Sequence, residues 1–194
     1  MAVTAKRPGK EAILRAAIEV MGEDGYEGAS IRDMAARAGV SVAALYYHFP
    51  SKHDLLREFL DEALDVTITR IERRMARHDT PVAQLKEVVG TIIWSNLHDD
   101  FARHAAYVVS SEDTRLNPPE RAAIEVKRKA LLDLIEGVVR DGIKQKKFKS
   151  DEPREASRAI LTLAQSTVGV EHEINRSLDD IIELYQRFAV ALVS

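Results

Sequence analysis

The side chains best suited to chemistry gather in one segment, residues 41–52, which reads Ser-Val-Ala-Ala-Leu-Tyr-Tyr-His-Phe-Pro-Ser-Lys. The phenol hydroxyls of Tyr46 and Tyr47, the imidazole of His48 and the ammonium of Lys52 are donors that bind phosphate oxygens. A helix that begins near Lys52 adds free backbone N–H groups and a favourable dipole for an anion. A fully buried helix would not carry two tyrosines and a histidine in succession, because their polar ends need partners. Taken singly each residue is ordinary on a surface, but together they indicate an exposed surface that binds phosphate groups.

Patterns for catalysis or metal binding are largely absent from the sequence. The chain has no cysteine, no Glu-x-x-His before any of its six histidines, and neither a His-Glu-x-x-His nor a Gly-x-x-x-x-Gly-Lys-Ser/Thr motif. Gly22, Gly25 and Gly28 imitate a phosphate loop, but no strand precedes them, so we interpret them as a helix stop and turn. Polar clusters that could approach a metal are His98, Asp99, Asp100 and His104, and Glu171-His172-Glu173. We interpret both clusters as solvated helix ends and expect no metal, no cofactor and no enzyme.

Helical periodicity runs through the whole chain and must position these groups. Apolar residues recur at steps of three and four, and all six prolines fall between the periodic stretches. No segment alternates with period two and ends in hairpin turn chemistry, so the sequence predicts an all-α fold. About nine helices are expected, at 10–24, 30–38, 41–48, 51–76, 82–100, 102–112, 119–143, 153–171 and 178–193. Their starts are marked by Ser30-x-x-Asp33, Ser51-x-x-Asp54 and Ser177-x-x-Asp180, and Gly25 and Gly39 suit helix ends.

The expected helices 30–38 and 41–48 are separated by only two residues. So short a turn forces the helices to cross steeply, and Gly39 supplies the positive φ that the turn requires. Residues expected to be buried at the crossing are Ala35, Val40 and Leu45. This is the layout of a helix-turn-helix, whose second helix enters the DNA major groove by its N-terminal end. The second helix coincides with the phosphate-binding segment, so the sequence favours a DNA-binding domain.

Composition places the chain among soluble globular proteins, with 45% apolar and 30% charged residues. The longest apolar run, Phe188 to Val193, is far shorter than the about 20 residues of a membrane span, and the N-terminus has no secretory signal. We therefore expect no membrane association and a cytoplasmic protein. The 28 Lys and Arg against 31 Asp and Glu give a net charge of −3, which by itself argues against a nucleic-acid binder.

The net charge hides where the positive charge lies. Residues 1–50 hold six bases and six acids, so residues 51–194 carry the whole deficit. Residues 34–53 contain two bases and no acid, and the first ten residues contain three bases and no acid. We expect the N-terminal arm, residues 1–9, to lie beside the DNA groove and to bind through Lys6 and Arg7, as the arms of other helical DNA readers do.

An ordered set of residues between Lys10 and Leu56 has the spacing of a known family. Its members are Ile13-Leu14, Ala16-Ala17, Gly25-Tyr26, Ser30-Ile31-Arg32-Asp33-Met34-Ala35, Ala38-Gly39-Val40-Ser41, Leu45-Tyr46-Tyr47-His48-Phe49, Ser51-Lys52 and Leu55-Leu56. The segment resembles the TetR (tetracycline repressor) family of bacterial transcription regulators. The resemblance covers the first quarter of the chain; the rest is similar only in length, helical character and number of helices.

This resemblance implies a dimer that binds a palindromic DNA operator through residues 1–50, followed by a ligand-binding and dimerisation domain over residues 51–194. The residues that match the family's DNA contacts are Ser30, Ser41, Ala43, Ala44, Tyr46, Tyr47, His48 and Lys52. The family often has Gly at position 43 and Thr or Ser at position 44. Ala43 and Ala44 offer only apolar contact, for instance to a thymine methyl, so the bases that are read differ.

The resemblance also implies an inducer pocket and a dimer interface formed by the last two long helices. Helices 153–171 and 178–193 are amphipathic, and they either form a four-helix bundle with a second copy or cover only their own core. The pocket residues we expect are Trp94, Phe101 and Tyr107, although aromatic residues at helical spacing are also typical of plain core. Other expected walls are Phe59, Ala63, Leu64, Met75, Leu131, Leu134, Ile135 and Val138.

The middle segment from Arg103 to Pro119 is similar to TetR-type regulators of fatty-acid and sterol breakdown, which sense acyl-CoA thioesters. Arg70, Arg73, Arg74 and Arg103 are either partners for a ligand's phosphates or solvated helix faces. The sequence thus predicts a ligand-responsive repressor, released from a palindromic operator by a small hydrophobic or acyl-CoA-type ligand. Two alternatives stay open: a small helical enzyme that uses the same apolar cavity, and a helical interaction module that does not bind DNA.

Overall fold

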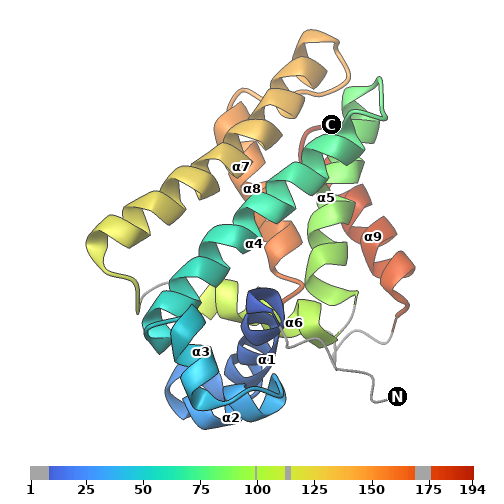
Figure 1. Ribbon diagram of the computed structural model, residues 1–194. Helices are drawn as coiled ribbons and strands as arrows, with labels where there is room; N and C mark the ends of the chain where they lie inside the picture. Colours follow the sequence, from blue (N-terminus) through green and yellow to red (C-terminus); the bar gives the residue numbers. More distant parts are fainter. Residues whose placement is uncertain (1–8, 99, 112–114, 169–175) are drawn as a thin grey trace.

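The computed structural model describes residues 9–98, 100–111, 115–168 and 176–194, and within these ranges its regular structure is entirely helical (Figure 1). The helices are α1 (Lys10–Gly28), α2 (Ile31–Arg37), α3 (Val42–His48), α4 (Lys52–Met75), α5 (Pro81–Leu97), α6 (Asp100–Ser111), α7 (Pro118–Lys144), α8 (Pro153–Gln165) and α9 (Leu178–Ala191). The predicted all-α fold is confirmed. In these ranges no helix combines the length and apolar character needed to cross a membrane.

Side-chain caps set the starts of several helices. The hydroxyls of Ser30, Ser51 and Ser177 each accept a hydrogen bond from the backbone N–H three residues on, at 3.1, 3.0 and 3.2 Å. All three caps were predicted from the Ser-x-x-Asp pattern. At the start of α7, Asn117 and Glu120 form a reciprocal capping box, which the sequence-based analysis missed.

The ends of α1 and α8 differ most from the prediction. α1 extends to Gly28 instead of ending near residue 24, but the chain bends at Gly25, where φ is 71° and ψ is 168°. Glycine adopts this conformation without strain, so the predicted stop is a kink followed by one more helical turn. α8 ends at Gln165 instead of residue 171, because the hydroxyls of Ser166 and Thr167 donate to carbonyls three residues back and close the last turn. Residues 169–175 lie outside the described ranges.

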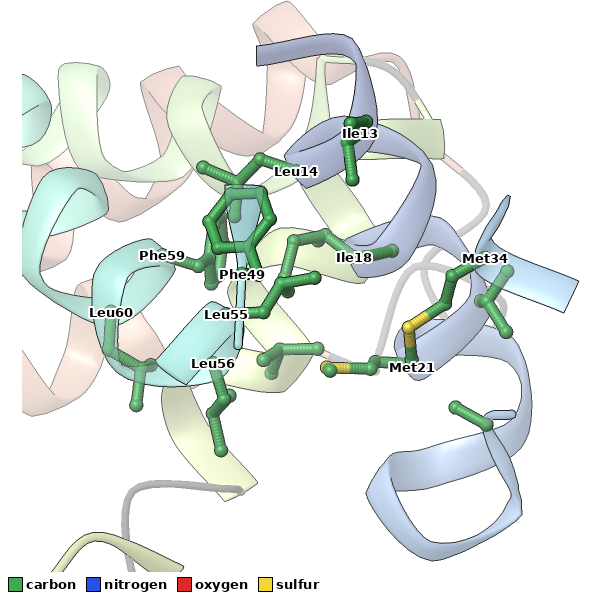
Figure 2. Packing of buried hydrophobic residues seen from close by; sticks show 14 of the residues in the cluster. Ile13, Leu14, Ile18, Met21, Met34, Phe49, Leu55, Leu56, Phe59 and Leu60 are labelled. Atoms are coloured by element: carbon green, nitrogen blue, oxygen red, sulfur yellow. The ribbon is translucent and has the colours of Figure 1, made fainter. Parts of the chain in front are cut away.

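The first hydrophobic core joins α1, α2 and α3 to the first half of α4 (Figure 2). Ile13, Ile18 and Met21 of α1 are fully buried, as is Leu45 of α3. The members of this core from α4 lie within residues 55–64, and α6 and α7 contribute single residues. The three short helices therefore depend on α4 to complete their core.

The second core is built around α5. Leu85, Val88, Val89 and Ile93 have no exposed surface, and α5 packs against α4, α6, α7, α8 and α9. Ile71, from the second half of α4, belongs to this core. Figure 1 shows α4 running the length of the molecule, from the helix-turn-helix end to the turn before α5. One continuous helix therefore contributes to both cores.

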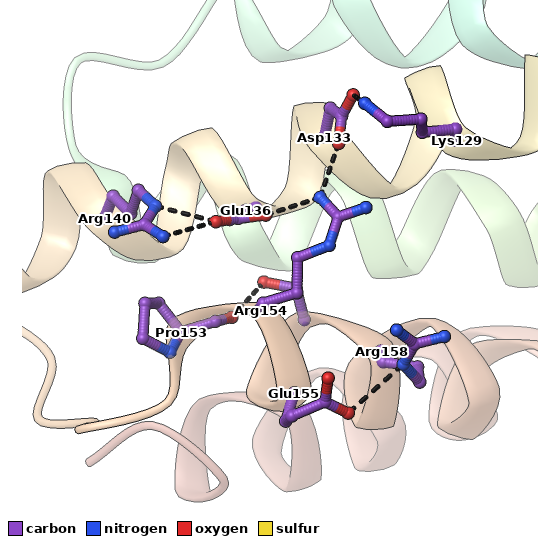
Figure 3. A network of polar contacts seen from close by, with 9 residues as sticks. Lys129, Asp133, Glu136, Arg140, Pro153, Arg154, Glu155 and Arg158 are labelled. Carbon is purple, nitrogen blue, oxygen red and sulfur yellow. Dashed lines mark hydrogen bonds and ion pairs between the residues drawn. The ribbon is translucent and has the colours of Figure 1, made fainter. Parts of the chain in front are cut away.

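Arg154, near the start of α8, ties this helix to α7 (Figure 3). One guanidinium nitrogen lies 2.5 Å from a carboxylate oxygen of Asp133 and 2.6 Å from one of Glu136. Lys129 and Arg140 bind the same two carboxylates from α7 itself. The hydrogen bonds from Arg154, supported by those from Lys129 and Arg140, hold the pKa values of Asp133 and Glu136 below their usual range.

Candidate nucleic-acid interface and ligand cavity

The connection between α2 and α3 has the geometry of a helix-turn-helix. Gly39 has φ 68°, and the backbone N–H of Val40 donates to the carbonyl of Ala35 at 2.9 Å. Ser41 then caps α3 by accepting from the N–H of Ala44 at 3.1 Å. Ala35 and Leu45 are buried at the crossing and Val40 is half-buried, as the spacing predicted. The turn is therefore fixed by one glycine and one hydroxyl.

α3 presents one face to solvent and buries the other. Tyr47 is 85% exposed and Tyr46 is 47% exposed, whereas Leu45 and Phe49 are buried. The ring of His48 is half-buried and meets the Tyr47 ring edge-on, with 5.3 Å between the ring centroids. A hollow of about 710 Å³ beside this face is lined by Ile13, Gly39, Val40, Ser41, Ala44, Tyr47 and His48. The structure thus brings Ser41, Ala44, Tyr47 and His48, which were predicted as DNA contacts, to one surface.

Lys52 is held by the end of α1. Its ammonium donates to the carbonyl of Ala29 at 2.5 Å and to the carbonyl of Tyr26, and it lies 4.4 Å from the centre of the Tyr26 ring. A cation at the C-terminal end of a helix is favoured by the helix dipole. An ammonium has three N–H donors, so a contact to phosphate would come in addition to these bonds.

Arg37 does not offer a free positive charge, contrary to the expectation from the acid-free stretch around it. Its two terminal nitrogens bind the two carboxylate oxygens of Glu23 at 2.9 and 2.7 Å, and Glu19 lies 3.7 Å away. The hydrogen bonds raise the pKa of Arg37 and lower that of Glu23. Both acids belong to α1, which packs against α2. Lys6 and Arg7, the predicted contacts of the arm, lie outside the described residues.

A cavity of about 450 Å³ lies among the helices of the C-terminal part and opens to the surface near Ser110 and Gln165, which are exposed. It is lined by Ala63, Leu64, Thr67, Ile92, Ser95, Asn96, Ala105, Ala106, Val109, Ser110, Arg128, Leu131, Leu161, Gln165 and Val168. These residues come from α4, α5, α6, α7 and α8, with Val168 just after α8. Its walls are mainly apolar, with a few scattered polar groups, which is the usual character of a small-molecule site. Of the walls that were predicted, Ala63, Leu64 and Leu131 line this cavity.

None of the three aromatic residues predicted for the pocket is among the residues that line this cavity. Phe101 packs on the first core, and the guanidinium of Arg15 lies 4.1 Å from its ring centre. Tyr107 is 45% exposed. Trp94 stacks on His98, with 3.7 Å between ring centroids, and borders a separate surface groove. Helical spacing predicted which residues share a helix. It did not predict which side of each helix faces the cavity, because the packing of five helices decides this.

α6 lies between the cavity and α1, an arrangement that the sequence-based analysis did not foresee. One face of α6 lines the cavity with Ala105, Ala106, Val109 and Ser110. Another face packs on α1, where a side chain added at Gly22 would overlap His104. Nδ1 of His104 is buried there without a hydrogen-bond partner. A change in the cavity can therefore reach α1 through a single helix.

Acid and histidine side chains do not assemble a metal site in the part of the chain that the structure describes. His98 is exposed and its Nδ1 lies 2.9 Å from the carbonyl of Trp94, while His104 packs against α1. Asp99 and residues 171–173, which belong to the two clusters considered from the sequence, lie outside the described ranges.

A helix-turn-helix that precedes a helical domain with a cavity is the architecture of a helical DNA-binding regulator. Residues 13–59 match the family described as bacterial regulatory proteins, tetR family, and residues 78–169 match the tetracyclin repressor-like C-terminal domain. The chain belongs to the TetR family of bacterial transcriptional regulators.

Full-length relatives support the family assignment. The chain is 28% identical over 190 residues to the fatty acid metabolism regulator protein of Bacillus subtilis, covering 97% of this chain and 96% of that protein. Its fold is similar to that of FadR from Bacillus subtilis in complex with stearoyl-CoA, with a TM-score of 0.79, 23% identity and coverage of 96% and 100% of the two chains. AibR in complex with isovaleryl coenzyme A and operator DNA gives a TM-score of 0.81, 21% identity and coverage of 95% and 97%.

Proposed function

We propose that this regulator is a homodimeric repressor that releases its operator when a hydrophobic or acyl-CoA-type ligand fills the cavity. The observation that carries the proposal is the position of α6, which contacts both the cavity and α1. α4 provides a second connection, because it starts directly after α3 and lines the cavity with Ala63, Leu64 and Thr67. A coupling free energy of about 1–3 kcal/mol between the two sites is the usual scale for such regulators.

In this proposal residues 1–50, with the start of α4, contact double-stranded DNA, and residues 51–194 bind ligand and dimerise. The proposed contacts are Lys6, Arg7, Ser30, Ser41, Ala43, Ala44, Tyr46, Tyr47, His48 and Lys52. The exposure of Tyr46 and Tyr47 supports phosphate contacts through their hydroxyls. The methyl groups of Ala43 and Ala44 suit contact with a thymine methyl in the major groove.

α8 and α9 form the proposed dimer interface. Phe188 of α9 and Leu192, which caps the end of this helix, are 47% and 49% exposed, a large apolar surface for one short helix. Ile181 and Ala189 of the same helix are buried against the second core. The apolar residues of α9 thus cover their own core and also leave an outward patch that suits a four-helix bundle with a second copy. Such a dimer would place its two α3 helices for half-sites about 34–36 Å apart.

The proposed ligand class rests on two similar structures, one holding stearoyl-CoA and the other isovaleryl coenzyme A. The cavity volume of about 450 Å³ falls in the range of small-molecule sites, and Ile92, Leu131 and Leu161 supply apolar walls. Ser95 and Asn96 provide polar atoms beside these walls. These lining residues replace Trp94, Phe101 and Tyr107 as the proposed ligand contacts inside the cavity.

An enzyme that uses the same cavity is the alternative function, and it would need an acid–base pair. The described lining residues include a single ionisable side chain, Arg128, which binds Glu125 at 2.9 Å and the carbonyl of Val109 at 3.3 Å. This supports binding without turnover. With genomic DNA as its partner, the proposed site of action is the cytoplasm.

A gel-shift assay with the DNA upstream of its own coding region tests the proposal. We expect a shift that weakens steeply as salt rises and that is reversed by a saturating acyl-CoA of suitable chain length. A helical module without DNA binding would give no shift at any salt concentration. An enzyme would consume the thioester, which mass spectrometry of the same mixture detects. Retention of DNA by protein shown to be saturated with thioester would contradict the proposed response.

A further inference from the structure

A second hollow lies on the surface between α4 and α5. Its volume is about 560 Å³, and it is lined by Asp65, Val66, Thr69, Arg70, Arg73, Arg74, Arg77 and Trp94. Four of these eight residues are arginines. Arg70, Arg73 and Arg74 lie one turn apart near the end of α4, and Arg77 follows in the turn after the helix. We call this hollow the arginine groove.

Three of the four arginines, Arg70, Arg73 and Arg77, have no carboxylate partner among the residues that the structure describes. Arg74 binds Glu87, whose other oxygen lies 3.0 Å from His78. Burial of Glu87 opposes its ionisation, but these hydrogen bonds outweigh burial and lower its pKa, so Glu87 offsets the charge of Arg74. Arg73 and Arg77 are exposed, and no ion pair of theirs occurs among the residues that the structure describes.

Arg70 connects the arginine groove to the ligand cavity. Its Nη1 donates to the hydroxyl of Ser95 at 3.0 Å, and Ser95 lines the cavity while Trp94 lines the groove. The guanidinium of Arg70 also lies 4.8 Å from the centre of the Trp94 ring, which holds it by a cation–π contact. On α4, Thr67 lines the cavity and Thr69 lines the groove. The ligand cavity and the arginine groove therefore share one wall.

We propose that the arginine groove binds phosphate groups, and that they belong to the polyphosphate head of the ligand whose apolar part fills the cavity. This inference rests on the proposed function and adds a second part to its ligand site, carried by Arg70, Arg73 and Arg77. Guanidinium groups bind phosphate through paired hydrogen bonds and are weakly hydrated, so they suit a multiply charged anion. An apolar cavity that shares a wall with a cationic groove fits an amphiphile with such an end.

The test compares two acyl thioesters, one that carries the phosphate-bearing nucleotide part of CoA and one that lacks it. Octanoyl-CoA and octanoyl-N-acetylcysteamine share the acyl chain and the thioester, and the second has no phosphate group. Trp94 is the only tryptophan of the chain, so its fluorescence reports on the groove. Arg73→Gln combined with Arg77→Gln removes two of the three uncompensated charges and leaves Arg70, which contacts Ser95 of the cavity wall. Lys86→Gln is the matched control, because Lys86 is an exposed cation on α5 that does not line the groove.

We expect the double variant to bind octanoyl-CoA about 10- to 100-fold more weakly than the wild type. Its affinity for octanoyl-N-acetylcysteamine should equal that of the wild type, and Lys86→Gln should bind both ligands normally. Millimolar inorganic pyrophosphate should change Trp94 fluorescence in the wild type but not in the double variant. If the double variant has a lowered melting temperature, Arg73→Lys with Arg77→Lys repeats the test with the charges kept and should retain most of the salt-dependent affinity.

Equal affinity of the wild type and the double variant for octanoyl-CoA would overturn the inference while leaving the proposed function intact. Equal weakening for both thioesters would also overturn it, because the arginines would then act on the cavity instead of on phosphate. If no acyl thioester binds but pyrophosphate still acts through Arg73 and Arg77, phosphate binding by the groove is supported. In that case free polyphosphate is its source, and the ligand class under the proposed function is wrong.

Discussion

Tyr47 projects further into solvent than any other large side chain of α3, with 85% of its surface exposed. Tyr47→Ala should therefore leave the free energy of unfolding within about 0.5 kcal/mol of the wild type. Operator binding should weaken by about 1 kcal/mol, the usual worth of one hydrogen bond. The loss should be equal for all operator sequences, because a phosphate contact carries no base identity. Tyr47→Phe should give the same loss in gel shifts, and an effect limited to one sequence would instead assign Tyr47 to base recognition.

Lys52 should behave differently from Tyr47, because its ammonium binds the carbonyls of Tyr26 and Ala29. Lys52→Met keeps the aliphatic stem, and it should lower the free energy of unfolding by about 1–3 kcal/mol in urea denaturation. Operator affinity should also fall. If the same ammonium touches a phosphate, the slope of log affinity against log salt should decrease in magnitude by about one. Unchanged stability would contradict the contacts with α1.

Single residues also show which contacts a sequence pattern can predict and which it cannot. The exposure of Tyr46 and Tyr47 was predictable, because two polar aromatic rings in succession do not suit a buried helix. The pairing of Arg37 was not, because Glu23 lies fourteen positions earlier on another helix. Glu19 and Glu23 lie one turn apart on α1 and so share one side of that helix. This spacing is the sequence signal that could have predicted the ion pair between Glu23 and Arg37.

At the scale of elements, the turn from α7 to α8 is fixed by one close contact. A side chain added at Gly142 would overlap the ring of Phe148, which is 2% exposed, whereas Gly137 on the same helix has open space around it. Gly142→Ala should destabilise the protein by about 1–3 kcal/mol through displaced packing. Gly137→Ala should stabilise it by about 0.5–1 kcal/mol through helix propensity. Thermal unfolding of both variants checks the pair, and equal shifts would contradict the contact.

The attachment of α8 to α7 should depend on pH through Asp133 and Glu136. Their folded-state pKa values are lowered, so their contribution is present above the unfolded values of about 4 and is lost as pH falls through the lowered values. Melting temperatures of the wild type and Arg154→Gln should therefore differ at neutral pH and converge in acid. Arg158→Gln is the control, since Arg158 pairs within α8 with Glu155. A difference that persists once both carboxylates are protonated would contradict this origin.

The helices were predictable because their signals are local: an apolar period, a capping hydroxyl, a proline between stretches. The cavity was not, since its lining residues come from five helices and each contributes only the side chains that face a common point. Ala105, Ala106 and Val109 have little to distinguish them in sequence from any other helix core. Large aromatic residues favoured the prediction of a pocket, yet Phe101 packs on the first core and Tyr107 is exposed.

For the whole molecule, the outward patch of α9 leads to a prediction about assembly. Phe188→Glu with Leu192→Glu places two charges where the proposed bundle would be apolar, so the variant should be monomeric by light scattering at micromolar concentration. Operator affinity should fall with it, because a monomer holds a single half-site. Val126→Glu is the control, a 69% exposed apolar residue on α7. A wild type that is already monomeric at that concentration would exclude the proposed interface.

The path of α4 through both cores sets a limit on how this regulator can be recombined with its relatives. The proposed DNA contacts fall at its start, yet the apolar residues that complete the first core extend to Leu64. A hybrid joined after residue 50 would give the three short helices a foreign supporting helix. A junction beyond Leu64 would keep the part of that core that α4 supplies, but it would carry part of the native cavity wall into the hybrid. Transplanting the operator specificity of this chain therefore also transplants some of its ligand preference.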